Sequence, residues 1–250
     1  MSIESNDDLE GVREAGRVTT AILDALVAHL RAGVTTGDLD AIAAGILARD
    51  GARSAPAMVY GFPGHVLISV NDEIVHGIPG RRRIAAGDLV SLDVTVEKDG
   101  YVADAARSVV VGAVVGHGLA TADHLVAAAE AALARGVSVA RAGVPVNEIG
   151  RAVQREVRRR GFAVVRGLCG HGVGRTIHEA PEVPNVYDRS LRDVLTDGLV
   201  LTIEPMISAG SSYPVQSADG WTLRTRDGSL AAHCEHTLVI TNGEPLILAA

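Results

Sequence analysis

Alternating apolar and polar positions between residues 88 and 104 predict a β-hairpin. The even-numbered positions from Val90 to Val96 are all apolar and share one face of the predicted strand, so Asp93 points to the other face. The polar, glycine-ended segment Glu97–Gly100 is typical of a four-residue hairpin loop, and Tyr101 then begins the returning strand. The hairpin therefore carries an acid on its polar face.

The expected register of this hairpin sets two carboxylates against each other. If Val96 pairs with Tyr101, Asp93 lies opposite Asp104. Directly opposed side chains have Cβ atoms about 5 Å apart, where like charges are destabilising. Either one carboxyl binds a proton or a cation lies between the two. A shifted register that exposes both carboxylates to water is the alternative.

Apolar residues at the 3.6-residue helical spacing predict two pairs of helices. The first pair runs from Arg13 to Leu30 and from Thr36 to Gly51. The second pair runs from Asp123 to about Ala140 and from about Asn147 to Arg160. The same order of elements thus occurs twice.

The two pairs belong to an internal duplication. Ala32–Val34 maps onto Ala142–Val144 at an offset of 110 residues. At nearly the same offset, Val90–Asp93 maps onto Leu201–Glu204, so an acid corresponds to an acid. The duplication predicts two halves, about 10–115 and 120–248, that pack about a pseudo-two-fold axis.

The duplication also predicts that four acids converge. Asp104 and Glu235 are each followed by a glycine eight residues later, across a β-rich run. Together with Asp93 and Glu204, they give each half two strand-borne carboxylates. Helices segregated from an antiparallel sheet make the expected fold class α+β. Because no Pro/Gly-rich linker separates the halves, we expect a single catalytic domain over residues 1–250.

Composition and charge narrow the class of protein. The net charge of −7 argues against nucleic acid or an acidic membrane as the main partner. No apolar run reaches the roughly 18 residues of a membrane span, and the acidic N-terminus lacks the apolar segment of a signal peptide. Two cysteines, Cys169 and Cys234, are too few for a disulfide framework, and we expect reduced thiols in a cytoplasmic protein.

A histidine is expected to join the four acids. Four clustered carboxylates need positive charge, and Asp, Glu and His together suit divalent ions. The best candidate is His171, because glycines on both sides of it remove the Cβ atoms that would keep the backbone away from a site. An ordinary turn is the alternative for a glycine-flanked histidine.

Five motifs resemble those of type I methionine aminopeptidases in sequence, order and spacing. The resemblance runs from about Asp8 to Leu248 and is carried by Val70–Pro79, Asp93 with Asp104, Gly170–Pro181, Thr202–Pro205 and Asp219–Thr237. It implies the pseudo-symmetric pita-bread fold and a site for two divalent ions, drawn from Mn, Fe, Co or Zn. The implied ligands are Asp93, Asp104, His171, Glu204 and Glu235.

The same resemblance implies catalytic roles. In such a site the two ions activate water for attack on the first peptide bond. Glu204 corresponds to the proton acceptor for that water, while His76 and His178 correspond to residues that contact the scissile amide and its carbonyl. A capped loop is the alternative for His76, and a surface ion pair with Glu179 is the alternative for His178.

The resemblance also implies a pocket for a methionine side chain. Its walls would include Val59, Phe62, Ile177 and Trp221, although Phe62 and Trp221 could equally belong to the core. Four positions of this pocket are aliphatic where relatives more often carry aromatic residues or cysteine, so the shape of the pocket is left open: Val59, Leu67, Leu168 and Ile177.

The expected function is removal of the initiator methionine from nascent proteins whose second residue is small. The expected partners are the N-terminal peptides of nascent proteins, with at most a transient encounter at the ribosome, no membrane and no nucleic acid, and the expected state is a monomer. Three rivals stay open: a Xaa-Pro aminopeptidase or dipeptidase, a binding module that has lost catalysis, and a structural metal-binding protein.

Overall fold

The structure is a computed structural model that describes residues 1–112 and 117–250, with helices packed against antiparallel strands. The helices are α1 (Asn6–His29), α2 (Thr36–Asp50), α3 (Ala55–Tyr60), α4 (His117–Val139) and α5 (Asn147–Arg159). All four predicted helices are confirmed, and the α+β class with them. The predicted end of the first half, near residue 115, lies outside the described residues.

Local capping sets where the first two helices begin and end. α1 begins before Arg13 because the Ser5 hydroxyl accepts the N–H of Asp8 at 3.1 Å and caps the helix. In α2 the Thr35 hydroxyl accepts the N–H of Asp38, whose carboxylate accepts the N–H of Thr35 in return. Gly51 ends α2 with φ of 61°, a conformation that glycine adopts freely.

In residues 1–112 and 117–250, four sheets with antiparallel pairing lie between the helices. One sheet contains β1 (Arg53–Ser54), β4 (Leu89–Lys98), β2 (Leu67–Val70) and β5 (Tyr101–Val110). The five-stranded sheet is ordered β15 (Leu246–Ala249), β14 (His236–Val239), β9 (Val200–Ile203), β7 (Cys169–Gly172) and β8 (Glu179–Pro184). Two three-stranded sheets complete the fold: β13 (Ala231–His233), β10 (Met206–Ser208) and β6 (Ala163–Val164), and β11 (Pro214–Gln216), β12 (Leu223–Thr225) and β3 (Glu73–Val75).

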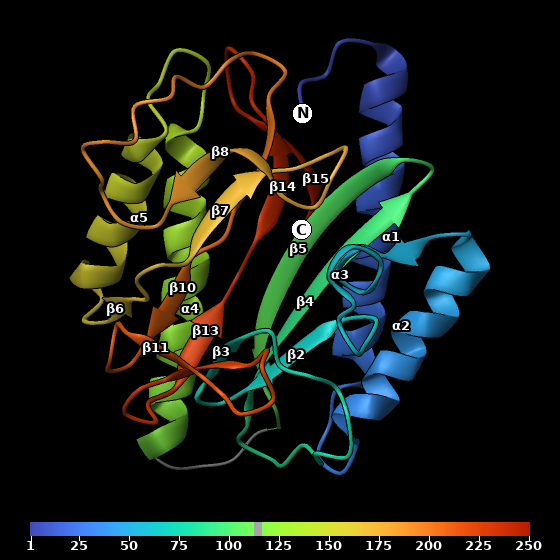
Figure 1. The fold of residues 1–250 in the computed structure, drawn as a ribbon. Coiled ribbons are helices and arrows are strands. Elements are labelled where there is room, and N and C mark those ends of the chain that lie inside the picture. The colour runs from blue at the N-terminus through green and yellow to red at the C-terminus, as the bar shows by residue number, and fades with distance from the viewer. Residues whose placement is uncertain (113–116) are drawn as a thin grey trace.

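The helices α1 and α2 lie on one side of the strands and α4 and α5 on the other (Figure 1). Each pair covers its own apolar core. On one side, Ile22 and Leu26 of α1 and Leu39 of α2 pack with Leu92 of β4, all fully buried. On the other side, residues of α4 and α5 pack with apolar residues of β9, β10 and β14. The two duplicated halves therefore meet along the strands.

The hairpin has a different register from the predicted one. Lys98, not Val96, pairs with Tyr101, so Asp104 lies opposite Thr95 and Asp93 lies opposite Ala106. The loop contains only Asp99 and Gly100, both with positive φ, which is the two-residue turn that matches strand twist. Because the error is two residues, and side chains alternate with a period of two, Asp93 and Asp104 still share one face of the sheet.

In the described part of the chain, no helix has the length and apolar character that crossing a membrane requires.

Candidate metal centre

Five strand-borne or strand-flanking side chains meet where the two halves join. Asp93 lies on β4, Asp104 on β5 and His171 on β7, while Glu204 follows β9 and Glu235 precedes β14. These are the five residues that the sequence analysis expected to converge. Each strand of the central hairpin and three segments of the second half thus contribute to one place.

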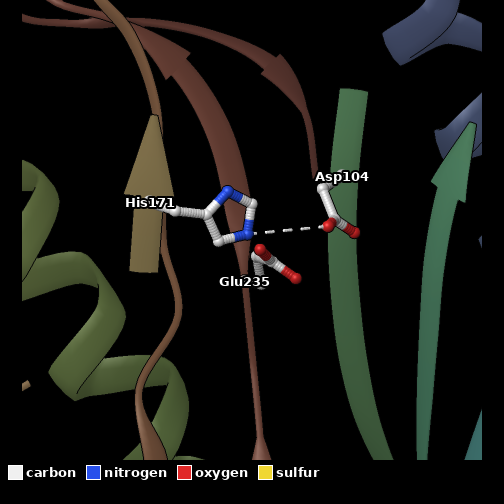
Figure 2. Close-up of side chains that lie close together, drawn as sticks. All are labelled: Asp104, His171 and Glu235. Atoms are coloured by element: carbon white, nitrogen blue, oxygen red, sulfur yellow. Dashed lines mark ion pairs between the residues drawn. The ribbon is translucent and has the colours of Figure 1, made fainter. Parts of the chain in front are cut away.

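His171 faces two of the acids across this junction. Its Nε2 lies 3.3 Å from Glu204 Oε1 and 4.0 Å from Asp104 Oδ2. Figure 2 shows the ring of His171 pointing toward Asp104 with Glu235 beside it. Ligand atoms of Asp104, His171 and Glu235 all lie within 4.8 Å of one another, which is close enough to share one cation.

Backbone contacts between the halves fix these side chains. Ala106 and Glu235 exchange backbone hydrogen bonds of 2.9 and 3.3 Å. The Thr237 hydroxyl accepts the N–H of Asp104 and donates to its carbonyl. As a result, Asp104 of the first half and Glu235 of the second are held next to each other.

The acids of this cluster are buried and repel one another. Asp104 is 5%, Glu204 8% and Glu235 1% exposed. Burial, with the neighbouring carboxylates, raises the pKa values of Asp93, Glu204 and Glu235 well above the ordinary range. Burial also raises the pKa of Asp104 to about 6, against the lowering effect of the Thr95 hydroxyl.

The residues fit a cation site. Among the described residues, no Lys or Arg forms an ion pair with any of the four acids. Asp104 Oδ1 and Glu235 Oε1 are buried without a hydrogen-bond partner in the same part of the chain. Carboxylate oxygens and imidazole nitrogen suit Mn, Fe, Co and Zn, and a divalent cation would supply the missing positive charge.

His171 is oriented as a metal-binding imidazole would be. Its Nδ1 lies 3.0 Å from the carbonyl oxygen of Gly172, so the N–H on Nδ1 donates there and leaves the lone pair of Nε2 facing the acids. Burial lowers the pKa of His171 to about 4, which keeps the ring neutral at pH 7. The predicted glycines matter here, because a Cβ on Gly172 would lie 2.2 Å from the Ala180 carbonyl oxygen.

Two further predicted histidines lie at the mouth of the centre. The rings of His171 and His178 have centroids 4.2 Å apart, and His76 lines the same cavity as both. The Glu179 carboxylate is bonded to the backbone N–H of Thr176 at 2.8 Å, rather than to His178. The surface ion pair considered for His178 is therefore absent from the hydrogen bonds of the described chain.

A cavity of about 310 Å³ opens onto the centre. Its apolar wall is formed by Val75, Leu168 and Met206. Of the pocket positions named from the resemblance, Leu168 lines this cavity, whereas Val59, Phe62, Ile177 and Trp221 are not among its lining residues. Val59 is 48% exposed on α3, and Ile177 is 5% exposed within an apolar cluster.

The other two predicted pocket residues contact each other. Phe62 is buried and meets the ring of Trp221 edge-on at a centroid distance of 5.2 Å. The assignment of Val59, Phe62, Ile177 and Trp221 to a methionine pocket stays a prediction.

His233 also belongs to this cluster and was not predicted from the sequence. This residue ends β13 and is 1% exposed, and its Nε2 lies 3.8 Å from both Glu204 Oε2 and Glu235 Oε2. Extended chain repeats every two residues, so the spacing from Glu235 could have placed His233 on the same face. The sequence analysis also gave no role to Thr202, whose hydroxyl accepts the N–H of His171 and donates to Glu204 Oε1 at 2.9 Å.

Fold and site together define a class. A duplicated α+β fold that gathers buried acids and imidazoles, with no basic side chain paired to the acids among the described residues, is typical of a protein that binds divalent metal. Consistent with this class, residues 10–242 match the model of metallopeptidase family M24. The chain belongs to this family.

Sequence relatives and solved structures support this family assignment. The chain is 41% identical over 250 residues to methionine aminopeptidase 2 of Bacillus subtilis, covering 99% of each chain. It is 38% identical to the methionine aminopeptidase of Escherichia coli, covering 97% of this chain and 91% of that protein. The methionine aminopeptidase of Rickettsia prowazekii superposes with a TM-score of 0.94 at 33% identity, with full coverage of both chains.

More distant structures share the fold alone. A prolidase from Pyrococcus furiosus matches with a TM-score of 0.78 at 22% identity, and this chain covers 65% of it. The predicted resemblance to methionine aminopeptidases and the predicted pita-bread fold are confirmed.

Proposed function

We propose that this chain is a methionine aminopeptidase that removes the initiator methionine from nascent proteins when the second residue is small. The observation that carries the proposal is the set of three buried acids, the half-buried Asp93 and His171, with no basic side chain paired to the acids in the described chain. The identity of 38–41% to methionine aminopeptidases over nearly the whole chain supports the substrate class.

Asp93, Asp104, His171, Glu204 and Glu235 would hold two divalent cations. When bound, such cations lower the pKa of water and polarise a carbonyl group. Most of the ligand side chains are buried, and burial strengthens electrostatic interactions between them. The metal would be chosen from Mn, Fe, Co and Zn by availability.

Glu204 is assigned as the proton acceptor for the attacking water. The Thr202 hydroxyl donates to its Oε1, which fixes the carboxylate in one orientation. Its other oxygen, Oε2, faces away from that hydrogen bond and lies 3.8 Å from His233 Nε2. Thr202 thus holds Glu204 in one orientation, with its carboxylate facing the centre where the attacking water would give up its proton.

His178 is assigned as the donor to the substrate carbonyl. The Tyr60 hydroxyl lies 2.7 Å from Nδ1 of His178, and we assign the tyrosine as the donor in this bond. The remaining proton is then on Nε2, where it can donate to a carbonyl oxygen. Burial lowers the pKa of His178, so the neutral ring is the form present at pH 7.

His76 is assigned to the scissile amide. It is one of the non-glycine residues with positive φ, at 62°, a conformation that persists only where the surroundings hold it. Burial and the neighbouring His178 lower the pKa of His76, which favours a neutral ring that can accept or donate a hydrogen bond.

The substrate would enter through the cavity above the centre. A volume of about 310 Å³ is at the small end of ligand pockets, which suits one side chain and one peptide bond. Leu168 and Met206 supply apolar and polarisable contacts for a thioether. We propose that this wall receives the methionine side chain together with the predicted residues Phe62 and Trp221.

The proposal extends to organisation and setting. Both halves contribute ligands, so we propose that they form one catalytic unit. A nascent-chain substrate implies action in the cytoplasm, where translation occurs, with transient proximity to the ribosome and no need for a second subunit.

Hydrolysis of Met-Ala-Ser and of Ala-Pro peptides, each with Mn, Fe, Co and Zn, tests this function. We expect release of methionine from Met-Ala-Ser and no cleavage of Ala-Pro. Cleavage of Ala-Pro alone would favour the Xaa-Pro rival, and cleavage of neither peptide with any ion would contradict both enzyme assignments.

A further inference from the structure

His233 is a buried imidazole whose two ring nitrogens have no hydrogen-bond partner in the described chain. The residue is 1% exposed, and neither Nδ1 nor Nε2 reaches a donor or acceptor. Buried polar atoms in folded proteins are nearly always partnered, so two orphaned nitrogens on one ring require an explanation. The simplest explanation is a bound group that is not part of the protein chain.

The surroundings of His233 indicate what that partner is. Nε2 lies 3.8 Å from Glu204 Oε2 and 3.8 Å from Glu235 Oε2. These separations are too long for hydrogen bonds. Two ligand atoms that share one cation, each about 2.1 Å from it, lie about 3 to 4 Å apart.

The distances around His233 match those around His171. Nε2 of His171 lies 3.3 and 4.0 Å from its two carboxylate oxygens. Ligand atoms of Glu204, His233 and Glu235 all lie within 4.8 Å of one another, as do those of Asp104, His171 and Glu235. Glu235 belongs to both groups and joins them.

We propose that His233 is a sixth protein ligand of the centre and binds a divalent cation through Nε2 together with Glu204 and Glu235. This inference rests on the proposed metal centre. Nδ1 of His233 faces Asp93 Oδ2 at 4.0 Å, in keeping with the tendency of metal-binding imidazoles to direct their second nitrogen toward a carboxylate.

A second imidazole changes which ions the centre prefers. Nitrogen ligands favour borderline ions such as Co, Zn and Fe over the harder Mn, which prefers oxygen. His233 therefore gives this chain a centre biased toward borderline ions. The bias should be lost when the imidazole is replaced by an amide.

Proton NMR of the Co(II)-loaded protein counts the bound imidazoles. Each cobalt-bound histidine gives a strongly shifted, exchangeable N–H signal from its second nitrogen. The proposal predicts two such signals in the wild type. His233→Gln should keep only the signal of His171, and His171→Gln should keep only the signal of His233. His178→Gln should retain both, which shows that the second signal does not come from His178.

His236 offers a matched control. It directly follows Glu235, and its Nδ1 lies 2.8 Å from the Glu235 carbonyl, but its side chain lines a different cavity from that of the centre. His236→Gln repeats the same chemical change beside the same ligand and should leave both signals. Calorimetric titration of metal-free protein should show Co(II) or Zn(II) binding at least about tenfold weaker in His233→Gln than in His236→Gln, with a smaller difference for Mn(II).

The outcomes separate this inference from the proposed function. A single wild-type signal that is lost in His171→Gln and kept in His233→Gln would overturn the role of His233 and leave the centre intact. A wild type that binds no cation would overturn both. If His233→Gln does not fold, as judged by circular dichroism, His233→Asn takes its place, and retention of both signals in that variant would also overturn the proposal.

Discussion

Buried acids in this protein have two contrasting environments. Glu73 accepts hydrogen bonds from Arg82 at 2.7 Å and Arg224 at 2.6 Å, and Glu156 is bonded by Arg159 and Arg160. The acids of the metal centre have no such arginine in the described chain. Similar side chains, similarly buried, are neutralised by the protein in one region and left uncompensated in the other.

The pKa values follow this division. The guanidinium groups of Arg159 and Arg160 lower the pKa of Glu156 to about 2, whereas burial raises the pKa of Asp104 to about 6. The first arrangement stabilises the fold by itself. The second stabilises it only when something else supplies positive charge, which is the physical signature of a binding site.

Removing one acid from the centre should have the largest effect on function. Asp104→Asn keeps the shape of the side chain but removes a charge that faces His171 and the other acids. We expect activity on Met-Ala-Ser to fall by about 10³-fold or more, since losing several kcal/mol of transition-state stabilisation has that effect. Calorimetric titration should show metal affinity falling by orders of magnitude as well.

Cys234→Ser is the control for this change. Cys234 precedes Glu235 but lies in the apolar core, and burial raises the pKa of its thiol to about 12. We expect unchanged turnover per folded molecule. Near-normal turnover in Asp104→Asn would contradict the role of that carboxylate as a ligand.

The metal-free protein should lose stability as the pH rises. Acids whose folded pKa values are raised contribute most below their unfolded pKa values near 4, and that contribution disappears as the pH rises through the folded values, about 6 for Asp104. We expect the free energy of unfolding of chelator-treated protein to fall by on the order of 2 kcal/mol between pH 4 and pH 7.

Thermal melting at several pH values measures this effect. Glu235→Gln should raise the melting temperature of the metal-free protein at pH 7 while abolishing the stabilisation that added Mn(II) gives the wild type. A metal-free protein that becomes more stable between pH 4 and pH 7, with no change in Glu235→Gln, would show that these acids are already compensated.

The arginine-paired Glu73 should behave in the opposite way. Glu73→Gln leaves Arg82 and Arg224 without their shared carboxylate and weakens the bond from the Val70 N–H. Because both arginines are partly exposed to water, we expect a loss of about 1 to 2 kcal/mol in the free energy of unfolding. Metal affinity should not change, and a loss of metal binding comparable to that of Asp104→Asn would break the comparison.

Glu156 should show the smallest effect, with its own pH dependence. Its lowered pKa means that its contribution is present above about pH 4.5 and is lost as the pH falls toward 2. Its arginine partners lie at the surface, so Glu156→Gln should lose only about 0.5 to 1 kcal/mol at pH 7. Urea unfolding at pH 7 and pH 3 should show a smaller gap between variant and wild type at the lower pH; an equal gap would place the effect elsewhere.

Much of the centre could be predicted because it depends on periodicity. The duplication placed Asp93 with Glu204 and Asp104 with Glu235, and strand alternation set each acid on one face. The hairpin register was wrong because alternation does not distinguish a four-residue loop from the two-residue Asp99–Gly100 turn. The error was harmless, since a shift of two residues keeps every side chain on its face.

The features that the sequence did not reveal depend on contacts between distant segments. His233 has no motif of its own, and only the packing of β13 against β4 and the chain beyond β9 brings it near three acids. The two-residue spacing could have placed His233 on the same face as Glu235, but neither spacing nor composition encodes its closeness to Glu204 and Asp93. The apolar wall was predicted only in part: Leu168 was among the pocket positions named from the resemblance, whereas Met206 of β10 was not.

Anomalous diffraction from crystals soaked in Mn(II) tests the central claim most directly. The account predicts two manganese peaks about 3.5 to 4 Å apart, both bordered by the carboxylates of Asp104 and Glu235. Well-ordered crystals with the five side chains in place but no manganese between them would contradict it.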